Sequence, residues 1–142
     1  MKISARNQFR GKVAWVTLGA VNAEVGVTLP GGEQIVATVT NESVKSLNLK
    51  VDADVIALIK ASSVLVMTDA TGIRLSARNS LKGQVTTLEK GPIHAEVSIS
   101  LASGESVHAT ITQAACDALG LAEGIDATAV IKAPSVILGV PD

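Results

Sequence analysis

Two groups of cationic and polar residues occur twice in this sequence, at the same offset of 72 positions. Ser-Ala-Arg-Asn at 4–7 returns letter for letter at 76–79, and Lys-Ala at 60–61 returns at 132–133. Arginine presents a rigid fork of N–H donors that suits a tetrahedral oxyanion, and lysine adds a compact positive charge. These residues therefore predict a site for a dianion that is held by hydrogen bonds, without a metal ion.

A helix start adds further donors to each repeat. Thr40 and Ser43 stand where an alternating run ends and a short helical stripe begins, and Thr112 occupies the position of Thr40 in the second repeat. Because the first N–H groups of a helix are unpaired, a helix start favours an anion. Any one of these residues could instead be a plain surface group or a helix cap.

The extent of the duplication favours a shared site over that plainer interpretation. Residues 3–67 and 75–139 are identical at 25 of 65 positions, so more than half of the positions have changed. Structural constraint readily retains Gly, Ala and Val, but it explains a retained Ser-Ala-Arg-Asn less easily. The repeat also defines the domains, which we predict at 1–68 and 75–142 with a linker at 69–74.

Each repeat is expected to fold mostly as short strands. After a strand at 11–18, residues 23–29 alternate between apolar and polar, Pro-Gly-Gly predicts a turn, and 34–40 alternates again. One short helix should follow, before two last strands at 54–61 and 63–67. The predicted fold class is therefore all-β, as two tandem OB-fold-like small β-barrels with one short helix each.

The composition argues against several classes of protein. The net charge is −1, and Phe9 and Trp15 are the only aromatic residues, so a basic groove with stacking platforms for nucleic acid is not supported. A chain with 47% hydrophobic residues and so few aromatics should bury apolar surface between repeats or between chains. The single cysteine, Cys116, replaces Val44 of the first repeat and is interpreted as a small buried apolar residue.

Enzymatic activity is not expected, because no nucleophile and no acid–base pair repeats. His94 and His108 have no counterpart in the first repeat and are interpreted as surface or rim histidines. Glu24 and Glu96 do repeat, and are interpreted as solvated or subunit-interface charges. The chain begins without an apolar run and has no uncharged stretch long enough for a bilayer, so a cytoplasmic protein without a membrane partner is expected.

The repeated segments resemble the Mop module of molybdenum-binding proteins, which is the molbindin family within the TOBE class of small OB-like domains. The segments are Ser-Ala-Arg-Asn at 4–7, Gly-Lys-Val at 11–13, Val-Asn-Ala-Glu-Val at 21–25, Thr-x-x-Ser at 40–43 and Ile-Lys-Ala-Ser at 59–62. The resemblance covers nearly the whole chain twice, as in tandem di-Mop proteins. It implies cytoplasmic storage and homeostasis of molybdate and tungstate, each bound as an intact oxyanion without redox chemistry.

The resemblance also implies where the anions bind. In such proteins one module contributes the Ser-Ala-Arg-Asn segment, and its neighbour contributes the helix start and the Lys-Ala-Ser segment. The chains associate as homotrimers, with further anion sites near the threefold axis, for which Asn22 and His94 are candidates. The residues that match the oxyanion-binding motif are Ser4, Arg6, Asn7, Thr40, Ser43, Lys60, Ala61, Ser62, Ser76, Arg78, Asn79, Thr112, Lys132, Ala133 and Ser135.

The second repeat departs from this motif at two positions. Ser43 and Ser62 become Ala115 and Pro134, so one hydroxyl and one backbone donor are lost. The helix-side half-site of the second repeat should therefore be weaker or differently built. Two alternatives to oxyanion storage stay open: an OB-type nucleic-acid-binding protein, and a regulatory module that acts on a separate protein partner.

Overall fold

The first repeat forms strands where its alternating runs predict them. In the computed structural model, which describes residues 1–142, it contains β1 (Asn7–Leu18), β2 (Asn22–Thr28), β3 (Gln34–Thr40), α1 (Asn41–Ser46), β4 (Asp54–Ile59), the 3₁₀ turn η1 (Ala61–Ser63) and β5 (Leu65–Met67). The first strand begins at Asn7 rather than at Gly11, because its first half pairs with β4. Thr40 is the N-cap of α1, as the sequence predicts.

The second repeat has the same order of elements. It contains β6 (Asn79–Lys90), β7 (His94–Leu101), β8 (Ser106–Thr112), α2 (Gln113–Ala118), β9 (Asp126–Ile131), the 3₁₀ turn η2 (Ala133–Ser135) and β10 (Ile137–Gly139). The pairing of β1 with β2 shifts register between Val13 and Trp15, and β6 shifts against β7 between Val85 and Thr87. Because these positions are 72 residues apart, the duplication extends to the irregularities of the backbone. The all-β fold class is confirmed.

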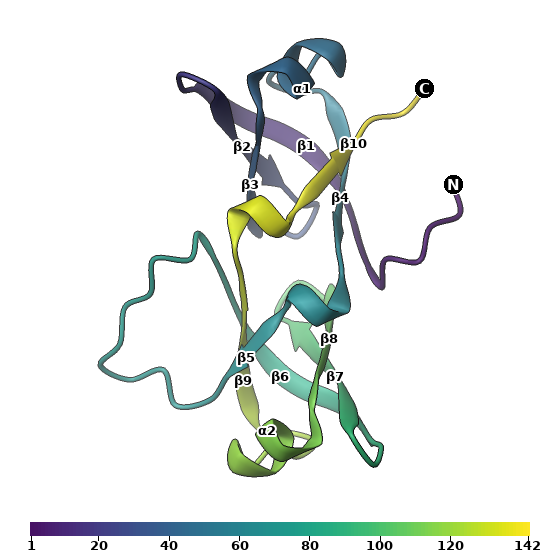
Figure 1. Cartoon of the computed structure of the whole chain (residues 1–142), viewed down its shortest axis with the longest axis vertical. Coiled ribbons are helices and arrows are strands. Elements are labelled where there is room, and N and C mark those ends of the chain that lie inside the picture. The colour runs from purple at the N-terminus through teal and green to yellow at the C-terminus, as the bar shows by residue number, and fades with distance from the viewer.

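The two repeats exchange their last strands. The strand orders are β10-β4-β1-β2-β3 and β5-β9-β6-β7-β8, so each curled five-stranded sheet takes one edge strand from the other repeat. Ile137 of β10 pairs with Leu58, and Leu65 of β5 pairs with Val130. Figure 1 shows both chain segments crossing the middle of the molecule through η1 and η2. The boundaries 1–68 and 75–142 therefore describe the sequence repeat, whereas the sheets cross them.

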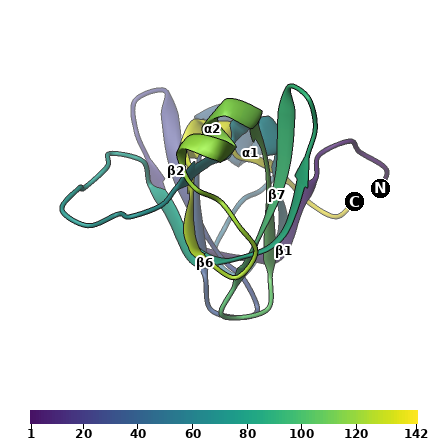
Figure 2. The ribbon, with the colours of Figure 1, turned by 90° about the horizontal axis from the view of Figure 1, so that it is seen from below.

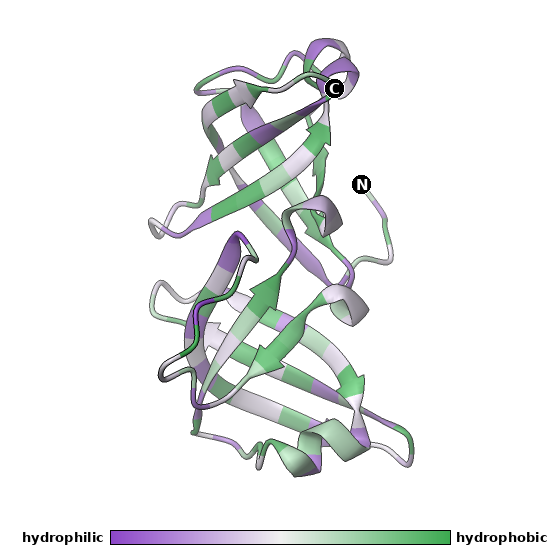
Figure 3. Ribbon diagram, turned by 60° about the vertical axis from the view of Figure 1, so that its left-hand side comes forward, coloured by the Kyte–Doolittle hydropathy of each residue, from purple (hydrophilic) through white to green (hydrophobic).

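The core is built from aliphatic side chains. One cluster of 29 buried residues includes residues of both repeats, and Phe9 is its only aromatic member. Cys116 is fully buried within it, as predicted. Figure 3 shows hydrophobic and hydrophilic residues alternating along the strands, which is the pattern of a sheet with one buried face.

The two sheets lie end to end along the long axis of the molecule (Figure 1). Seen from below in Figure 2, α1 and α2 overlap near the middle, and the β1–β2 and β6–β7 hairpins rise on opposite sides. In Figure 1 the two helices lie at opposite ends of the molecule. Neither six-residue helix has the length or the apolar character that crossing a membrane requires.

Candidate functional site

The Ser-Ala-Arg-Asn and Lys-Ala segments of each repeat lie side by side. Asn7 at the start of β1 pairs with Ile59 at the end of β4, so Arg6 and Lys60 flank the same pair of strands. In the second repeat, Asn79 pairs with Ile131 in the same way. Strand pairing thus brings together two cations that are more than fifty residues apart in the sequence.

Each retained asparagine joins its repeat to the edge strand of the other. The Asn7 amide donates to the carbonyl of His108 at 2.8 Å and accepts from the N–H of the same residue at 2.7 Å. Asn79 makes the same two bonds with the backbone of Val36, at 2.8 and 2.7 Å. An amide side chain offers one acceptor oxygen and two donors, so it pairs with a backbone as a neighbouring strand would. Both asparagines are 1% exposed, and these contacts occupy their polar atoms within the chain.

Each retained arginine also reaches the other repeat. Arg6 Nη1 lies 3.0 Å from Glu96 Oε1, and Arg78 pairs with Glu24. These glutamates therefore join the two repeats within one chain, a contact that the sequence did not predict. The Arg6 and Glu96 side chains are 48% and 47% exposed, so the pair contributes only about 0.2–1 kcal/mol. An anion could replace the carboxylate at a small loss of stability.

The lysine segment is open to solvent. Lys60 and Lys132 are exposed, and neither belongs to any of the four ion pairs in the chain. The two hydrogen bonds of η1 are donated by Ser63 and Val64, so neither uses the N–H groups of Ala61 and Ser62.

The 3₁₀ turn of the second repeat offers fewer donors. Ser135 and Val136 donate the equivalent bonds of η2, and Pro134 has no N–H group. The loss of one backbone donor in the second repeat is thus present in the structure.

We name the two clusters for their arginines. The Arg6 junction consists of Arg6, Asn7, Lys60, Glu96 and His108, and the Arg78 junction consists of Arg78, Asn79, Lys132, Glu24 and Val36. Ser4, Ala61, Ser62, Ser76, Ala133 and Ser135 lie in the segments that flank them.

The helix starts lie farther along the edge strands than the backbone groups that the asparagines bind. Thr40 Oγ1 accepts from Ser43 N–H at 3.0 Å and donates to Ser43 Oγ at 2.8 Å, and Thr112 accepts from Ala115 N–H at 3.1 Å. Thr40 lies four residues beyond Val36 along β3, which is roughly 13 Å at the rise of a strand, but only two residues beyond Thr38, the strand partner of Glu24. The structure therefore brings together the predicted arginines, asparagines and lysines, and Thr40 and Thr112 follow two residues after the strand partners of Glu24 and Glu96.

His108 has a position that the sequence pattern did not reveal. It is half-buried, and its Nδ1 lies 2.9 Å from Ser98 Oγ. Burial and the nearby Arg6 guanidinium lower the pKa of His108 below its ordinary value, and the Glu96 carboxylate acts in the opposite direction. The alternation of β7 places Glu96 and Ser98 on one face, and this was the only sign in the sequence that polar side chains gather beside Glu96.

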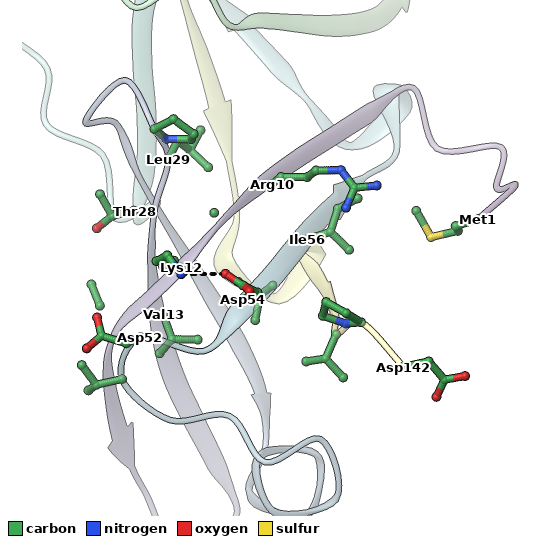
Figure 4. Close-up of a pocket in the computed structure, with 17 residues that line it drawn as sticks. Met1, Arg10, Lys12, Val13, Thr28, Leu29, Asp52, Asp54, Ile56 and Asp142 are labelled. Atoms are coloured by element: carbon green, nitrogen blue, oxygen red, sulfur yellow. Dashed lines mark hydrogen bonds and ion pairs between the residues drawn. The ribbon is translucent and has the colours of Figure 1, made fainter.

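Two grooves lie elsewhere on the molecule. A groove of about 1220 Å³ beside β1 and β4 contains the Lys12–Asp54 pair, whose atoms are 2.8 Å apart (Figure 4). The hydrogen bond and the charge of Asp54 raise the pKa of Lys12. A groove of about 720 Å³ occupies the equivalent place in the second repeat and includes Lys82 and Asp126. No predicted site residue lines either groove.

Comparisons with known proteins agree with the duplicated architecture. A family model described as TOBE domain matches residues 3–66 and 75–138. The chain is 44% identical over 140 residues to the molybdenum transport protein ModE of Herbaspirillum seropedicae, covering 99% of this chain and 52% of the relative. It is 43% identical over 141 residues to the molybdenum-pterin-binding protein MopA of Rhodobacter capsulatus, covering 99% and 53%. The chain thus spans about half the length of these curated relatives.

One solved structure matches over its full length. It is ModG, described as a cytoplasmic molybdate-binding protein and solved with molybdate bound. The TM-score is 0.97 at 52% sequence identity, covering 99% of this chain and 100% of the other. The fold, including the duplicated sheets, is therefore shared with that protein.

Proposed function

Because the chain belongs to the TOBE domain family, with one domain at 3–66 and a second at 75–138, we propose that it binds molybdate as an intact oxyanion at its two junctions. One observation carries the proposal. The only Arg and Lys residues that are identical in the two repeats flank, in each repeat, the same paired strand ends. The similarity to a protein of known structure that holds molybdate supports this choice of anion.

The geometry supports binding by hydrogen bonds and charge. In the Arg6 junction the guanidinium turns from Glu96 to the anion, and the Lys60 ammonium supplies a second positive charge. The backbone N–H groups of Ala61 and Ser62, which the hydrogen bonds of η1 do not use, supply a third set of donors. All of these groups are donors, so they suit a dianion whose four oxygens are acceptors.

Selectivity in this proposal comes from the size of the anion. Tungstate has the charge and shape of molybdate and should bind at the same junctions. Sulfate has the same charge and shape but is smaller, so it should be rejected mainly on fit. Comparable affinity for sulfate in a competition titration would contradict this part of the proposal.

We also propose that three copies of the chain assemble. Large apolar side chains are exposed at equivalent positions of both repeats: Val21 and Ile93 at 71% and 69%, Leu65 and Ile137 at 61% and 60%. Retention of exposed apolar residues in both repeats favours a surface between copies. A second copy would also bring a further helix start to a junction. Binding and assembly would then stabilise each other by mass action.

The proposed role is storage and homeostasis of molybdate in the cytoplasm, without catalysis. The length of the curated relatives favours one alternative, a regulatory module that acts on a separate partner, because those relatives carry about as much chain again. A pull-down with and without molybdate separates the two. A partner that is retained only with molybdate favours regulation.

Native mass spectrometry of the purified protein, with and without sodium molybdate, tests the proposed function. We expect a trimer that gains several discrete oxyanion masses. Arg6→Ala and Arg78→Ala should each remove a subset of them. Arg10→Ala is the matched control, because Arg10 is an exposed arginine of β1 outside both junctions. No bound oxyanion, or equal losses in the control, would contradict the proposal.

A further inference from the structure

The two junctions differ in the row of side chains beside each arginine–glutamate pair. Thr87, Ser98 and His108 lie opposite one another across β6, β7 and β8. The equivalent row of the first repeat is Trp15, Gly26 and Val36. Glu96 and Ser98 are two residues apart on one strand and share a face, as do Glu24 and Gly26. The Arg6–Glu96 pair therefore neighbours a polar row, and the Arg78–Glu24 pair neighbours an apolar one.

The apolar row is closed by the indole ring of Trp15. A side-chain carbon at Gly26 would collide with that ring, so no polar group can replace the glycine without moving the tryptophan. In the polar row, Ser98 Oγ and His108 Nδ1 are 2.9 Å apart and hold the imidazole in place. Among the differences between the junctions, the one that adds an ionisable group is the imidazole with its serine partner, in place of a valine and a glycine.

Two charged groups act on His108. Asn7 fixes the backbone of His108 at 2.7 and 2.8 Å, which keeps the imidazole near Arg6, and Glu96 lies on the neighbouring strand β7. Of the other elements against β8, η1 and β5 have no ionisable side chain, and Lys60 just before η1 is exposed. Helix α2 carries Asp117, which is bonded to Lys90 and Gln113.

Anion binding at the Arg6 junction would change both of these influences. As Arg6 turns to the anion, its positive charge moves from the imidazole towards the ligand, and Glu96 loses its partner. A dianion also arrives nearby. Each change favours the protonated imidazole, because a cation is withdrawn and negative charge is added or uncovered.

We infer that His108 makes anion binding at the Arg6 junction depend on a proton. As Arg6 turns to the anion, the imidazole gains a proton and pairs with Glu96. This inference rests on the proposed function. The Arg78 junction, with Val36 at the equivalent position, binds without this proton. The two junctions of one chain therefore respond differently to pH.

The direction of the effect follows from the two states of His108. The pKa of the imidazole is below its ordinary value in the free protein, and it rises on binding. Between those two values binding takes up one proton, so affinity increases as pH falls, by up to about tenfold per pH unit. Above the bound-state value the affinity is independent of His108.

Calorimetric titration of the full chain with sodium molybdate tests the inference. Arg78→Ala isolates the Arg6 junction, and Arg6→Ala isolates the Arg78 junction. Titrations at about pH 6 and about pH 8 bracket the range in which a histidine changes charge. Repeating each titration in two buffers of different ionisation enthalpy counts the protons taken up per anion.

We expect a steeper pH dependence, and about one proton taken up per anion, only at the Arg6 junction. His108→Val, which copies the first repeat, should remove both effects. His108→Gln keeps a hydrogen-bonding side chain near Ser98 without a charge, so it should retain the affinity at high pH and lose the slope. Protonation of molybdate itself affects both junctions equally and cancels in their difference.

The outcomes separate the two proposals. Equal slopes at the two junctions, or an unchanged slope in His108→Val, would overturn the inference and leave the proposed function standing. Absence of molybdate binding by the unaltered protein at either pH would overturn the proposed function itself. Val36→His with Gly26 retained is a further control, because an imidazole without its serine partner should restore little of the slope.

Discussion

The two hydrogen bonds between Asn79 and the Val36 backbone allow one contact between the repeats to be tested for its contribution to stability. Asn79 is 1% exposed and Val36 is 8% exposed, so water has little access to either. Asn79→Ala removes two hydrogen bonds, at 2.7 and 2.8 Å, and leaves one buried N–H and one buried carbonyl without a partner. At about 1–3 kcal/mol for each of the two buried groups left unpaired, we expect a loss of about 2–6 kcal/mol.

Such a loss would be a large share of the total stability of a domain, which is of order 5–15 kcal/mol. Urea denaturation followed by circular dichroism measures it, and the exchanged strands predict a single transition for the whole chain. Gln8→Ala is the control, because Gln8 is exposed and makes one side-chain bond, to the carbonyl of Ala5 at 3.0 Å. It should change stability by less than about 0.5 kcal/mol.

The result also decides what the asparagine does. A loss in Asn79→Ala no larger than that of the control would refute the conclusion that Asn79 joins the repeats. If stability were unchanged and molybdate affinity fell, Asn79 would be a ligand to the anion, as the sequence motif predicts. A loss of stability with unchanged affinity per folded molecule would assign it a structural role alone.

Three further outcomes follow from the contacts. Residues 1–68 alone can complete their five-stranded sheet only with another copy, so light scattering should find an oligomer. Gly26→Ala should destabilise the chain by about 1–3 kcal/mol in urea, because the new methyl group collides with Trp15. Glu24→Gln should change stability by less than about 1 kcal/mol, yet increase molybdate affinity in calorimetry, because it releases Arg78.

Each of these expectations has a result that contradicts it. A folded monomer of residues 1–68 would show that strand exchange is dispensable. Unchanged stability in Gly26→Ala would mean that the indole ring moves aside easily. Ser98→Ala supplies the comparison, because Ser98 is the counterpart of Gly26 in the second repeat, where no tryptophan is present. Weaker molybdate binding in Glu24→Gln would mean that the glutamate positions the arginine for the anion rather than competing with it.

The sequence by itself determined the features that depend on neighbouring residues. The repeat, the alternating strands such as Gln34–Thr40, and the helix that begins after Thr40 are all as predicted, because side-chain alternation and capping act over a few residues. The burial of Cys116 followed from its pairing with Val44 across the repeat. Fold class was accessible from the sequence for the same reason.

Only the tertiary structure decided which distant groups meet. The sequence placed β5 after β4, but not on β9, because backbone hydrogen bonds are the same for every residue type and do not specify a partner strand. It identified Asn7 and Arg6 as retained residues, but not their partners His108 and Glu96 in the other repeat. A residue can be retained in both repeats because it binds the anion or because it contacts the other repeat, and both roles constrain its side chain equally. Only the distances between side chains tell the two roles apart, and the exchange of strands sets those distances.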